Sequence, residues 1–300
     1  MLKIAYDPIY QHPLPEGHRF PMQKYELLPQ QLLHEGTCGP ENFFEPGFPA
    51  DADILRAHHK DYYENLRQGN LSRREMRKVG FPWSPELVRR ERRIAQGTIE
   101  GCHFALEYGV SMNIAGGTHH AYSNRGEAFC MLNDQAIGAH YLLDQNLAKR
   151  ILILDLDVHQ GNGTSEIFAG VPEVFTFSMH GRANYPFRKE ESDLDVALEP
   201  GTEDEEYLSV LKKNLSGLKK SVNPDFVFYL SGVDILATDK LGTLSVSPEG
   251  CRLRDEMVFQ WCHKHNLPVQ CSMGGGYSPQ LRTIVEAHAN TFRMAQFIFF

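Results

Sequence analysis

The segment ILILDLDVHQGNG, residues 151–163, joins an apolar run to two carboxylates and one imidazole. Asp155, Asp157 and His159 alternate along the chain, so an extended backbone places their side chains on one face. Burying such groups costs several kcal/mol unless a partner compensates them. A divalent metal ion is such a partner, because carboxylates and imidazoles are among its usual ligands.

Polar side chains also follow the other apolar runs that we expect to be strands. Glycines with metal-binding or acid–base side chains come after each run: GGTHH (116–120) after 110–115, MHG (179–181) after 174–178, SGVD (231–234) after 226–230 and MGGGY (273–277) after 268–272. Parallel strands end at the same edge of a sheet, and ligands of such sheets bind there. The five strand ends together predict one site.

Three of these residues have the chemistry of a catalytic metal centre. Asp157 and His159, joined by Asp234 from another strand end, would give three protein ligands and one open position. Mixed oxygen and nitrogen donors favour Zn²⁺ and also admit Fe²⁺, Co²⁺ or Mn²⁺. The alternative is that the aspartates cap turns and His159 is a core histidine. That alternative suits any one of them alone better than it suits all three together.

Two histidine pairs require separate interpretations. His119-His120 follows two glycines at a strand end, where the backbone can approach a ligand closely. Two imidazoles beside a catalytic metal could act as general base and general acid. His58-His59 lies in the charged stretch RAHHKDYYENL, so we interpret it as a partly exposed helix face. Tyr277, after three glycines, could donate a hydrogen bond to a developing oxyanion.

The elements that must position these residues alternate along the chain. Beside the strands above, an opening KIAYD strand is expected, and helical patterns cover 51–70, 85–108, 130–148, 204–220, 248–264 and 279–297. Such alternation predicts a single-domain, doubly wound α/β fold over residues 1–300, with a mostly parallel sheet and helices on both faces. Residues 1–50 are rich in Pro, His and Gly and are expected to form loops with short helices.

Composition excludes several classes of protein. A formal charge of -8 argues against nucleic-acid binding, which usually needs a basic surface, but admits a basic peptide as substrate. No run approaches the ~18 apolar residues of a membrane helix, and no P-loop is present. Six scattered cysteines without CxxC suit reduced thiols, and together with the absence of a signal-peptide pattern they predict a cytoplasmic protein.

Five separated motifs, in order, resemble the zinc-dependent histone deacetylase superfamily. They are GGTHHAYSNRGEAFCMLND (116–134), ILILDLDVHQGNGT (151–164), FSMHG (177–181), SGVDILATDKLGTLSVS (231–247) and GGGYS (274–278). The segments DLDVHQGNG, GTEDEEYL (201–208) and DKLGTLSVSPEG (239–250) look closest to class IV and to bacterial deacetylases of similar pattern. The resemblance implies the fold shared by arginases and deacetylases. It also implies hydrolysis of an acetyl or longer acyl group from acyl-lysine, in a peptide or a small acylated amine.

The resemblance implies a role for each matching residue. Zinc would be bound by Asp157, His159 and Asp234, proton transfer would fall to His119 and His120, and Tyr277 would polarise the acyl carbonyl. Asp155 would orient His119, and Asn162 would face His120. The acyl-lysine tunnel would be lined by Phe129, Tyr185, Leu241 and Gly275. Structural K⁺ would bind near Asp155, Asp157, His159, Ser178 and Met179, and a second K⁺ near Phe168, Val171 and Val174.

Two departures from the family pattern bear on function. Many members have Asp where this chain has Asn162, and an amide orients an imidazole without stabilising imidazolium by a full charge. We therefore expect His120 to be neutral more readily than in an Asp-paired enzyme. The rim aspartate of class I enzymes has no counterpart in PWSPELVRRERRIAQG (82–97). Two other functions are competing hypotheses. One is a binuclear ureohydrolase of arginase type, which needs further bridging carboxylates, and the other is a catalytically silent acyl-lysine binding module.

Overall fold

The computed structural model describes residues 1–300 and contains one sheet of eight parallel strands. Along the chain these are β1 (Lys3–Ala5), β2 (Phe43–Phe44), β3 (Val110–Asn113), β4 (Ile151–Asp155), β5 (Val174–Gly181), β6 (Leu194–Leu198), β7 (Phe226–Leu230) and β8 (Val269–Ser272). Their order in the sheet is β2-β1-β3-β8-β7-β4-β5-β6. The predicted α/β class with a parallel sheet is confirmed.

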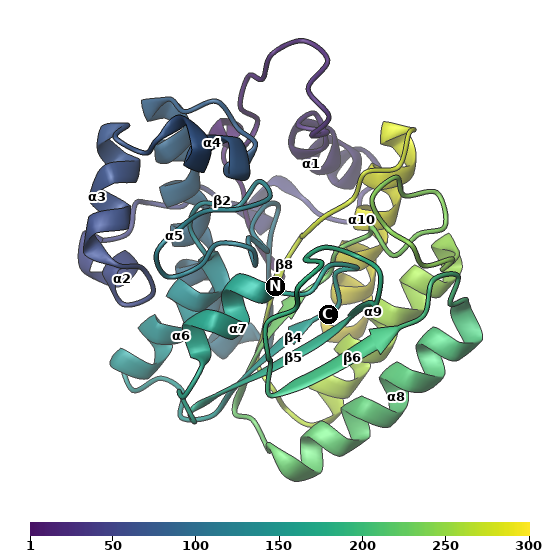
Figure 1. Cartoon of the computed structure of the whole chain (residues 1–300). Coiled ribbons are helices and arrows are strands. Elements are labelled where there is room, and N and C mark those ends of the chain that lie inside the picture. Colours follow the sequence, from purple (N-terminus) through teal and green to yellow (C-terminus); the bar gives the residue numbers. More distant parts are fainter.

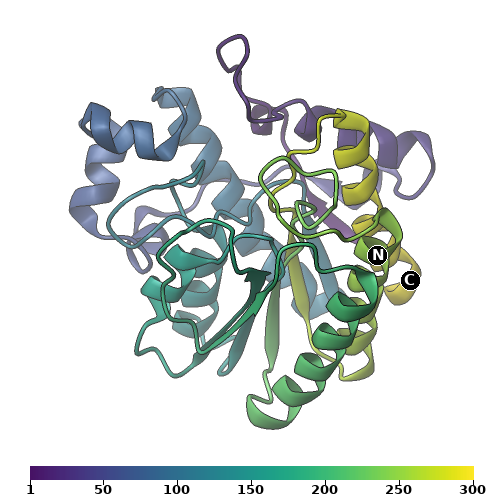
Figure 2. The same cartoon turned by 45° about the vertical axis from the view of Figure 1, so that its right-hand side comes forward.

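Helices cover the sheet on both faces. They are α1 (Lys24–His34), α2 (Asp51–Leu55), α3 (Lys60–Gln68), α4 (Arg73–Val79), α5 (Pro85–Tyr108), α6 (Asp134–Asp144), α7 (Asn162–Phe168), α8 (Asp204–Ser221), α9 (Pro248–Lys264) and α10 (Leu281–Phe299), with short 3-10 helices at Pro8–Tyr10 and Pro40–Asn42. Figures 1 and 2 show α5 and α6 on one face and α8, α9 and α10 on the other. None of the helices has a stretch both long and apolar enough to cross a bilayer.

The register of the central strands brings their carboxyl ends to one level. Asp155, the last residue of β4, pairs with Ser178 of β5 and with Leu230 of β7, and Leu230 pairs with Ser272 of β8. Every residue of β4 and β7 is buried, as expected for parallel strands covered on both faces. The apolar strands therefore anchor the polar segments that follow them at one edge of the sheet.

Local capping explains why several predicted helix boundaries are confirmed. Ser84 accepts a hydrogen bond from the N–H of Leu87, and Pro85 occupies the first turn of α5, which begins and ends where predicted. Ser247 caps α9 in the same way, by accepting from the N–H of Gly250. A polar cap followed by proline is a local signal, so it can be read from the sequence alone.

The predicted helical stretch 51–70 is interrupted at His58-His59, and the prediction of a partly exposed helix face there is wrong for His58, whereas His59 is exposed. The segment forms two helices, and His58 lies between them with 2% of its surface exposed. Its Nδ1 donates to the carbonyl of Tyr122 (3.0 Å), and its Nε2 accepts from the N–H of Asn133 (2.9 Å). These two tertiary hydrogen bonds tie the connection to the loop after β3, and no helical period could reveal them.

Candidate active site

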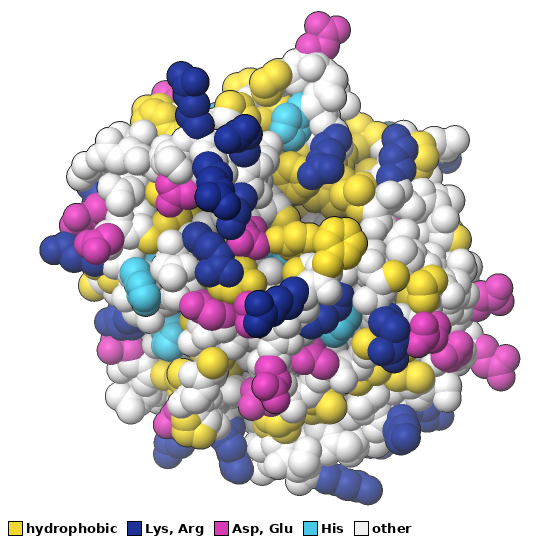
Figure 3. All heavy atoms as spheres, in the orientation of Figure 1, with side chains coloured by type: hydrophobic (Ala, Val, Ile, Leu, Met, Phe, Trp, Pro, Cys, Tyr) yellow, Lys and Arg dark blue, Asp and Glu magenta, His cyan; other side chains and the backbone are white.

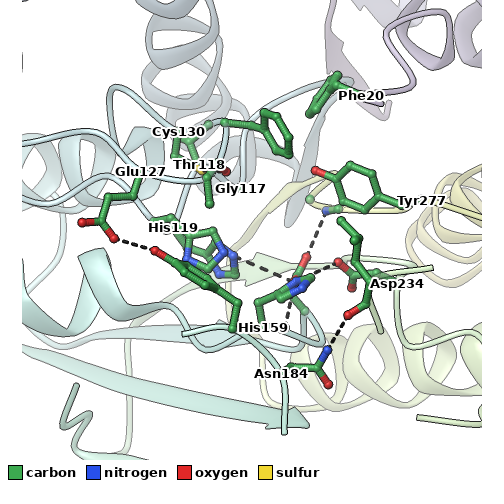
Figure 4. Close-up of a pocket in the computed structure, with 18 of the residues that line it drawn as sticks. Phe20, Gly117, Thr118, His119, Glu127, Cys130, His159, Asn184, Asp234 and Tyr277 are labelled. Atoms are coloured by element: carbon green, nitrogen blue, oxygen red, sulfur yellow. Dashed lines mark hydrogen bonds and ion pairs between the residues drawn. The ribbon is translucent and has the colours of Figure 1, made fainter. Parts of the chain in front are cut away.

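A cavity of about 710 Å³ opens at the carboxyl edge of the sheet. Figure 3 shows hydrophobic and basic side chains around a hollow on this face, and Figure 4 shows the residues inside. The side chains predicted for metal binding, proton transfer and oxyanion stabilisation all line it: His119, His120, Asp157, His159, Asp234 and Tyr277. The structure thus brings together residues that are up to 158 positions apart, counting from His119 to Tyr277.

Three buried side chains at the floor of the cavity could bind one metal ion. One donor atom from each of Asp157, His159 and Asp234 lies within 4.8 Å of the others. His159 Nδ1 is 3.0 Å from Asp157 Oδ1 and 3.2 Å from Asp234 Oδ2. Asp234 Oδ2 is buried without a partner in hydrogen-bond geometry. Burial raises the pKa of Asp234 to about 7, and the adjacent Asp157 carboxylate acts in the same direction.

Backbone around this cluster leaves room for an ion rather than for side chains. A Cβ atom at Gly275 would lie 2.2 Å from Asp234 Oδ2, so glycine is required there. The N–H of Gly275 donates to Asp157 Oδ2, and the N–H of Val158 donates to Asp234 Oδ1, both at 3.0 Å. These bonds fix both carboxylates. Asp234 Oδ2, which has no hydrogen bond, is left facing the imidazole of His159. The donor set fits a divalent cation, which would relieve the repulsion between the two carboxylates.

The two histidines after β3 lie side by side, with their ring planes tilted by 46°, but have different partners. Their ring centroids are 4.1 Å apart. Positive φ angles at Gly116 (82°) and Gly117 (73°) turn the backbone so that the pair enters the cavity. His119 Nδ1 lies 2.6 Å from Asp155 Oδ2, and His120 Nδ1 lies 2.6 Å from an oxygen of Asn162. The predicted pairing of these side chains is thus what the structure contains, whereas their catalytic roles stay predictions.

The surroundings of the pair shift the pKa values of the two imidazoles in opposite directions. Burial alone would lower the pKa of His119, but the Asp155 carboxylate raises it above its ordinary value. Burial, together with the neighbouring His119 and His159, holds the pKa of His120 well below that value. Asn162 donates its amide to the Tyr122 hydroxyl at 2.9 Å, so its oxygen accepts the Nδ1 proton of His120. His120 is therefore neutral, with a lone pair on Nε2.

Tyr277 is held by a residue that the sequence interpretation missed. Asp239 accepts a hydrogen bond from the N–H of Tyr277 through Oδ2, and from the N–H groups of Leu241 and Gly242 through Oδ1. One carboxylate thus joins the turn that carries the phenol to the loop on the opposite wall. An aspartate two residues before Leu241, in DKLG, has the spacing of a side chain that caps its own turn, and this signal could have found it.

The predicted tunnel residues Phe129, Tyr185, Leu241 and Gly275 all line the cavity. Tyr185 donates to Glu127 at 2.5 Å, and its ring centroid lies 5.0 Å from that of His120. Phe20, which was not predicted, packs edge-on against Phe129 at 5.1 Å. Aromatic rings therefore form the wall between the mouth and the histidines.

The segment 82–97, in which no rim aspartate was found, does not reach the mouth of the cavity. It contributes Arg90 and Ile94, which are both 2% exposed and line the buried end. The exposed side chains at the mouth include Arg19, Lys78 and Phe187, of which Phe187 is 92% exposed. The mouth therefore carries two basic side chains, Arg19 and Lys78, and the aromatic side chain of Phe187.

Of the residues implied for potassium, only Asp157 and His159 line the cavity. Ser178 and Met179 belong to β5, and Ser178 is in register with Asp155 of β4. The second set occupies a tight loop before β5, in which the carbonyl of Phe168 accepts from the N–H of Val171, and that of Val171 accepts from the N–H of Val174. Potassium at either place stays a prediction.

Comparison with known proteins identifies close relatives of the whole chain. The family model for the histone deacetylase domain matches residues 18–292. An uncharacterised protein of Picosynechococcus sp. is 43% identical over 296 residues, which are 99% of both chains. Histone deacetylase 2 of Arabidopsis thaliana is 30% identical and covers 92% of this chain and 74% of its own. The acetoin utilization protein AcuC of Staphylococcus aureus is 31% identical, covering 81% and 69%.

Solved structures share the fold. A histone deacetylase homologue complexed with SAHA superposes with a TM-score of 0.85 at 23% identity, over 98% of this chain and 84% of that chain. A homologue from Aquifex aeolicus gives 0.82 at 22% identity, with the same coverage. At this level of identity the likeness establishes the fold, which agrees with the arginase- and deacetylase-like architecture expected from the sequence.

Proposed function

This chain belongs to the histone deacetylase family, and from that premise we propose that it is a metal-dependent hydrolase of acylated amines. The substrate class is N-acyl-lysine in a peptide, or a related small acylated amine, with an acetyl or longer acyl group. The observation that carries the proposal is the meeting of three features in one cavity: the metal-binding cluster, the adjacent histidine pair and the phenol of Tyr277.

Asp157, His159 and Asp234 would hold the metal ion, Zn²⁺ in the first place and Fe²⁺ as the alternative. A metal bound there would supply Lewis acidity toward the acyl carbonyl and lower the pKa of water. The glycines around the cluster keep side chains out of this space. The protein's own part is to fix the three ligands, because both carboxylates are tied to backbone N–H groups.

The histidine pair would move the protons of the reaction. His120, neutral and with a free Nε2, suits the general base that takes a proton from the attacking water. His119 has a raised pKa because of Asp155, so it suits the acid that protonates the leaving amine. This division of roles follows from the partners of the two rings, a carboxylate for one and an amide for the other.

Tyr277 would donate its hydroxyl hydrogen bond to the oxyanion of the tetrahedral intermediate. Burial and the nearby Asp234 raise the pKa of Tyr277 well above its ordinary value, so the phenol stays protonated. A protonated donor that is fixed in place before the reaction stabilises charge as it develops. The hydrogen bond of the Tyr277 N–H to Asp239 supplies that fixed position.

The class, the domain organisation and the cellular location of the chain are also proposed. We place it in class IV of the superfamily, on the motifs DLDVHQGNG and DKLGTLSVSPEG, with one catalytic domain over residues 1–300 and structural K⁺ at the two places described. A cytoplasmic location is supported by the six cysteines, all of which are free and buried.

The test of the proposal is hydrolysis of a fluorogenic acyl-lysine substrate by the purified protein, with and without a chelator. Release of the fluorophore that the chelator abolishes supports the proposal. Binding of the substrate without turnover would instead identify a silent acyl-lysine module. Hydrolysis that is unaffected by the chelator would overturn the role of the metal.

A further inference from the structure

Arg90 lies at the buried end of the cavity with an unused hydrogen-bond donor. This residue of α5 lines the cavity beside Tyr25, and both are almost fully buried. Its Nε donates to the carbonyl of Tyr10 at 2.7 Å, and its Nη1 pairs with Glu91. Its Nη2 is buried and has no partner. A buried donor that lacks an acceptor costs stability, so an acceptor from a ligand is the natural complement of this group.

A second buried cation, Lys24, lies near Arg90, although it does not line the cavity. The ring of Tyr25 has two buried cations over it, Arg90 at 4.9 Å and Lys24 at 5.4 Å from its centroid. Lys24 is 1% exposed and donates to the carbonyl of Gly274 at 3.1 Å, so its charge has no carboxylate partner in hydrogen-bond contact. Glu91 is the carboxylate that pairs with Arg90, and burial raises the pKa of Glu91 although Arg90 opposes this. The free Nη2 donor of the Arg90 guanidinium therefore favours an acceptor that carries negative charge.

A carboxylate is the anion that fits these observations. The free Nη2 of Arg90 can donate a charge-assisted hydrogen bond to a carboxylate, and such a bond is stronger than a neutral one. Because Arg90 lines the same cavity as the histidine pair, its free donor can face a ligand bound there.

We propose that Arg90 makes the buried end of the cavity a carboxylate subsite, and that the protein hydrolyses lysine acyl groups that end in a carboxylate, such as succinyl or glutaryl. The inference rests on the proposed function, because it extends the substrate class of the same site. Water adds to the acyl carbon, the C–N bond breaks, and the lysine amine leaves with a proton. The product is the free dicarboxylate, and no oxidant or reductant is needed.

The experiment compares kcat/KM of the metal-loaded full chain on four peptides. Their lysine carries an acetyl, a pentanoyl, a glutaryl or a glutaramyl group, the last being the neutral amide of the glutaryl chain. The wild type is expected to prefer glutaryl over glutaramyl by roughly 10- to 100-fold. Arg90→Met is expected to remove this preference, which is the ratio of the kcat/KM values for the glutaryl and glutaramyl peptides. Arg89→Met, at the exposed neighbour on the same helix, is expected to leave this ratio unchanged.

Each other outcome decides against the subsite or against the function. Equal rates on glutaryl and glutaramyl in the wild type, with acetyl hydrolysed, overturn the subsite and leave the proposed function intact. If no peptide is hydrolysed, the proposed function fails, and calorimetric binding of the glutaryl and glutaramyl peptides decides the subsite alone. Equal binding overturns it, and a preference that Arg90→Met removes supports it.

A second variant of Arg90 and a measurement of inhibition by monocarboxylates complete the test. If circular dichroism shows that Arg90→Met is unfolded, Arg90→Lys replaces it, because it keeps the positive charge but lacks the Nη2 donor, and a reduced glutaryl preference is expected. A free monocarboxylate released by the reaction offers the same chemistry, so inhibition by acetate and butyrate is measured as well. Arg90-dependent inhibition without a glutaryl preference would show that the subsite takes the released acid and would overturn the substrate proposal.

Discussion

His120 Nδ1 lies 2.6 Å from Oδ1 of Asn162, the same distance that separates the neighbouring His119 from the carboxylate of Asp155. Two adjacent imidazoles thus make matching hydrogen bonds to an amide and to a carboxylate. A carboxylate stabilises imidazolium by a full charge, whereas an amide only orients the ring. Because of this difference, His119 is the ring that holds a proton and His120 is the ring that accepts one.

Replacing Asn162 by Asp should move the pH dependence of catalysis. A carboxylate at this position raises the pKa of His120, and a general base works only in its neutral form. The acidic limb of the kcat/KM profile should therefore shift to higher pH. Asn124→Asp, which adds the same charge at an exposed position, is the control. An unchanged acidic limb in Asn162→Asp would contradict the role given to this pair.

Tyr277→Phe should lower kcat by roughly 10²–10³, because it removes one oxyanion donor. KM should change little, since the hydrogen bond is made mainly to the transition state. Steady-state kinetics on an acetyl-lysine peptide measure both constants. Tyr141→Phe removes a phenol that bonds only His103 at the surface and should leave kcat unchanged. A Tyr277→Phe variant with full activity would rule out the oxyanion role.

The parts of the fold that could be predicted are those that local chemistry determines. The strand at Ile151–Asp155 is an uninterrupted apolar run, and α9 begins at a serine cap followed by proline. By contrast β6, at Leu194–Leu198, alternates partly exposed side chains at the edge of the sheet and was missed. The helix α7 was also missed, because Asn162 and Gly163 are expected in turns, while burial against the loop after β3 makes them helical.

The residues of the candidate site also fall into those that the sequence predicted and those that it did not. The strand-end rule grouped Asp157, His159 and Asp234, because the ends of parallel strands meet. Arg90 and Asp239 could not be found by that rule, since Arg90 lies within helix α5 and Asp239 lies in a loop. Their positions depend on how α5 and the loop before α9 pack against the cavity. Pattern alone carries no information on such packing.

His58 should make the stability of the protein depend on pH. Burial lowers the pKa of His58 to about 4, below its value in the unfolded chain, so the folded state requires the neutral ring. Its stabilisation is complete above about pH 6.5 and falls between about pH 6.5 and 4, by up to about 1.4 kcal/mol per pH unit. Urea unfolding at a series of pH values measures this slope.

Two variants isolate the contribution of His58. His58→Gln should cost about 1–3 kcal/mol at neutral pH, because it disturbs two buried hydrogen bonds, and it should reduce the slope between pH 6.5 and 4. His59→Gln changes the exposed neighbour and should preserve wild-type stability and slope. Identical slopes in the wild type and in His58→Gln would show that other groups are responsible.

Asp234→Asn should weaken the stabilisation of the protein by zinc. A ligand that binds only the folded state stabilises it by about 2.7 kcal/mol at a hundredfold excess over Kd, so Zn²⁺ should raise the Tm of the wild type. The variant lacks one of the three ligand side chains, and its Tm should respond weakly. Glu205→Gln, at an exposed carboxylate, should behave as the wild type. Equal zinc-dependent shifts in Tm for all three proteins would place the metal elsewhere.

The most direct test of the account is the turnover of an acetyl-lysine peptide by metal-stripped protein, measured against equivalents of Zn²⁺ added. A site built from Asp157, His159 and Asp234 predicts no turnover without metal and a linear rise to a plateau at about one ion per chain. A plateau near two ions would indicate a binuclear enzyme of arginase type. Turnover by the stripped protein, or none at any zinc concentration, would contradict the proposed metal-dependent hydrolase.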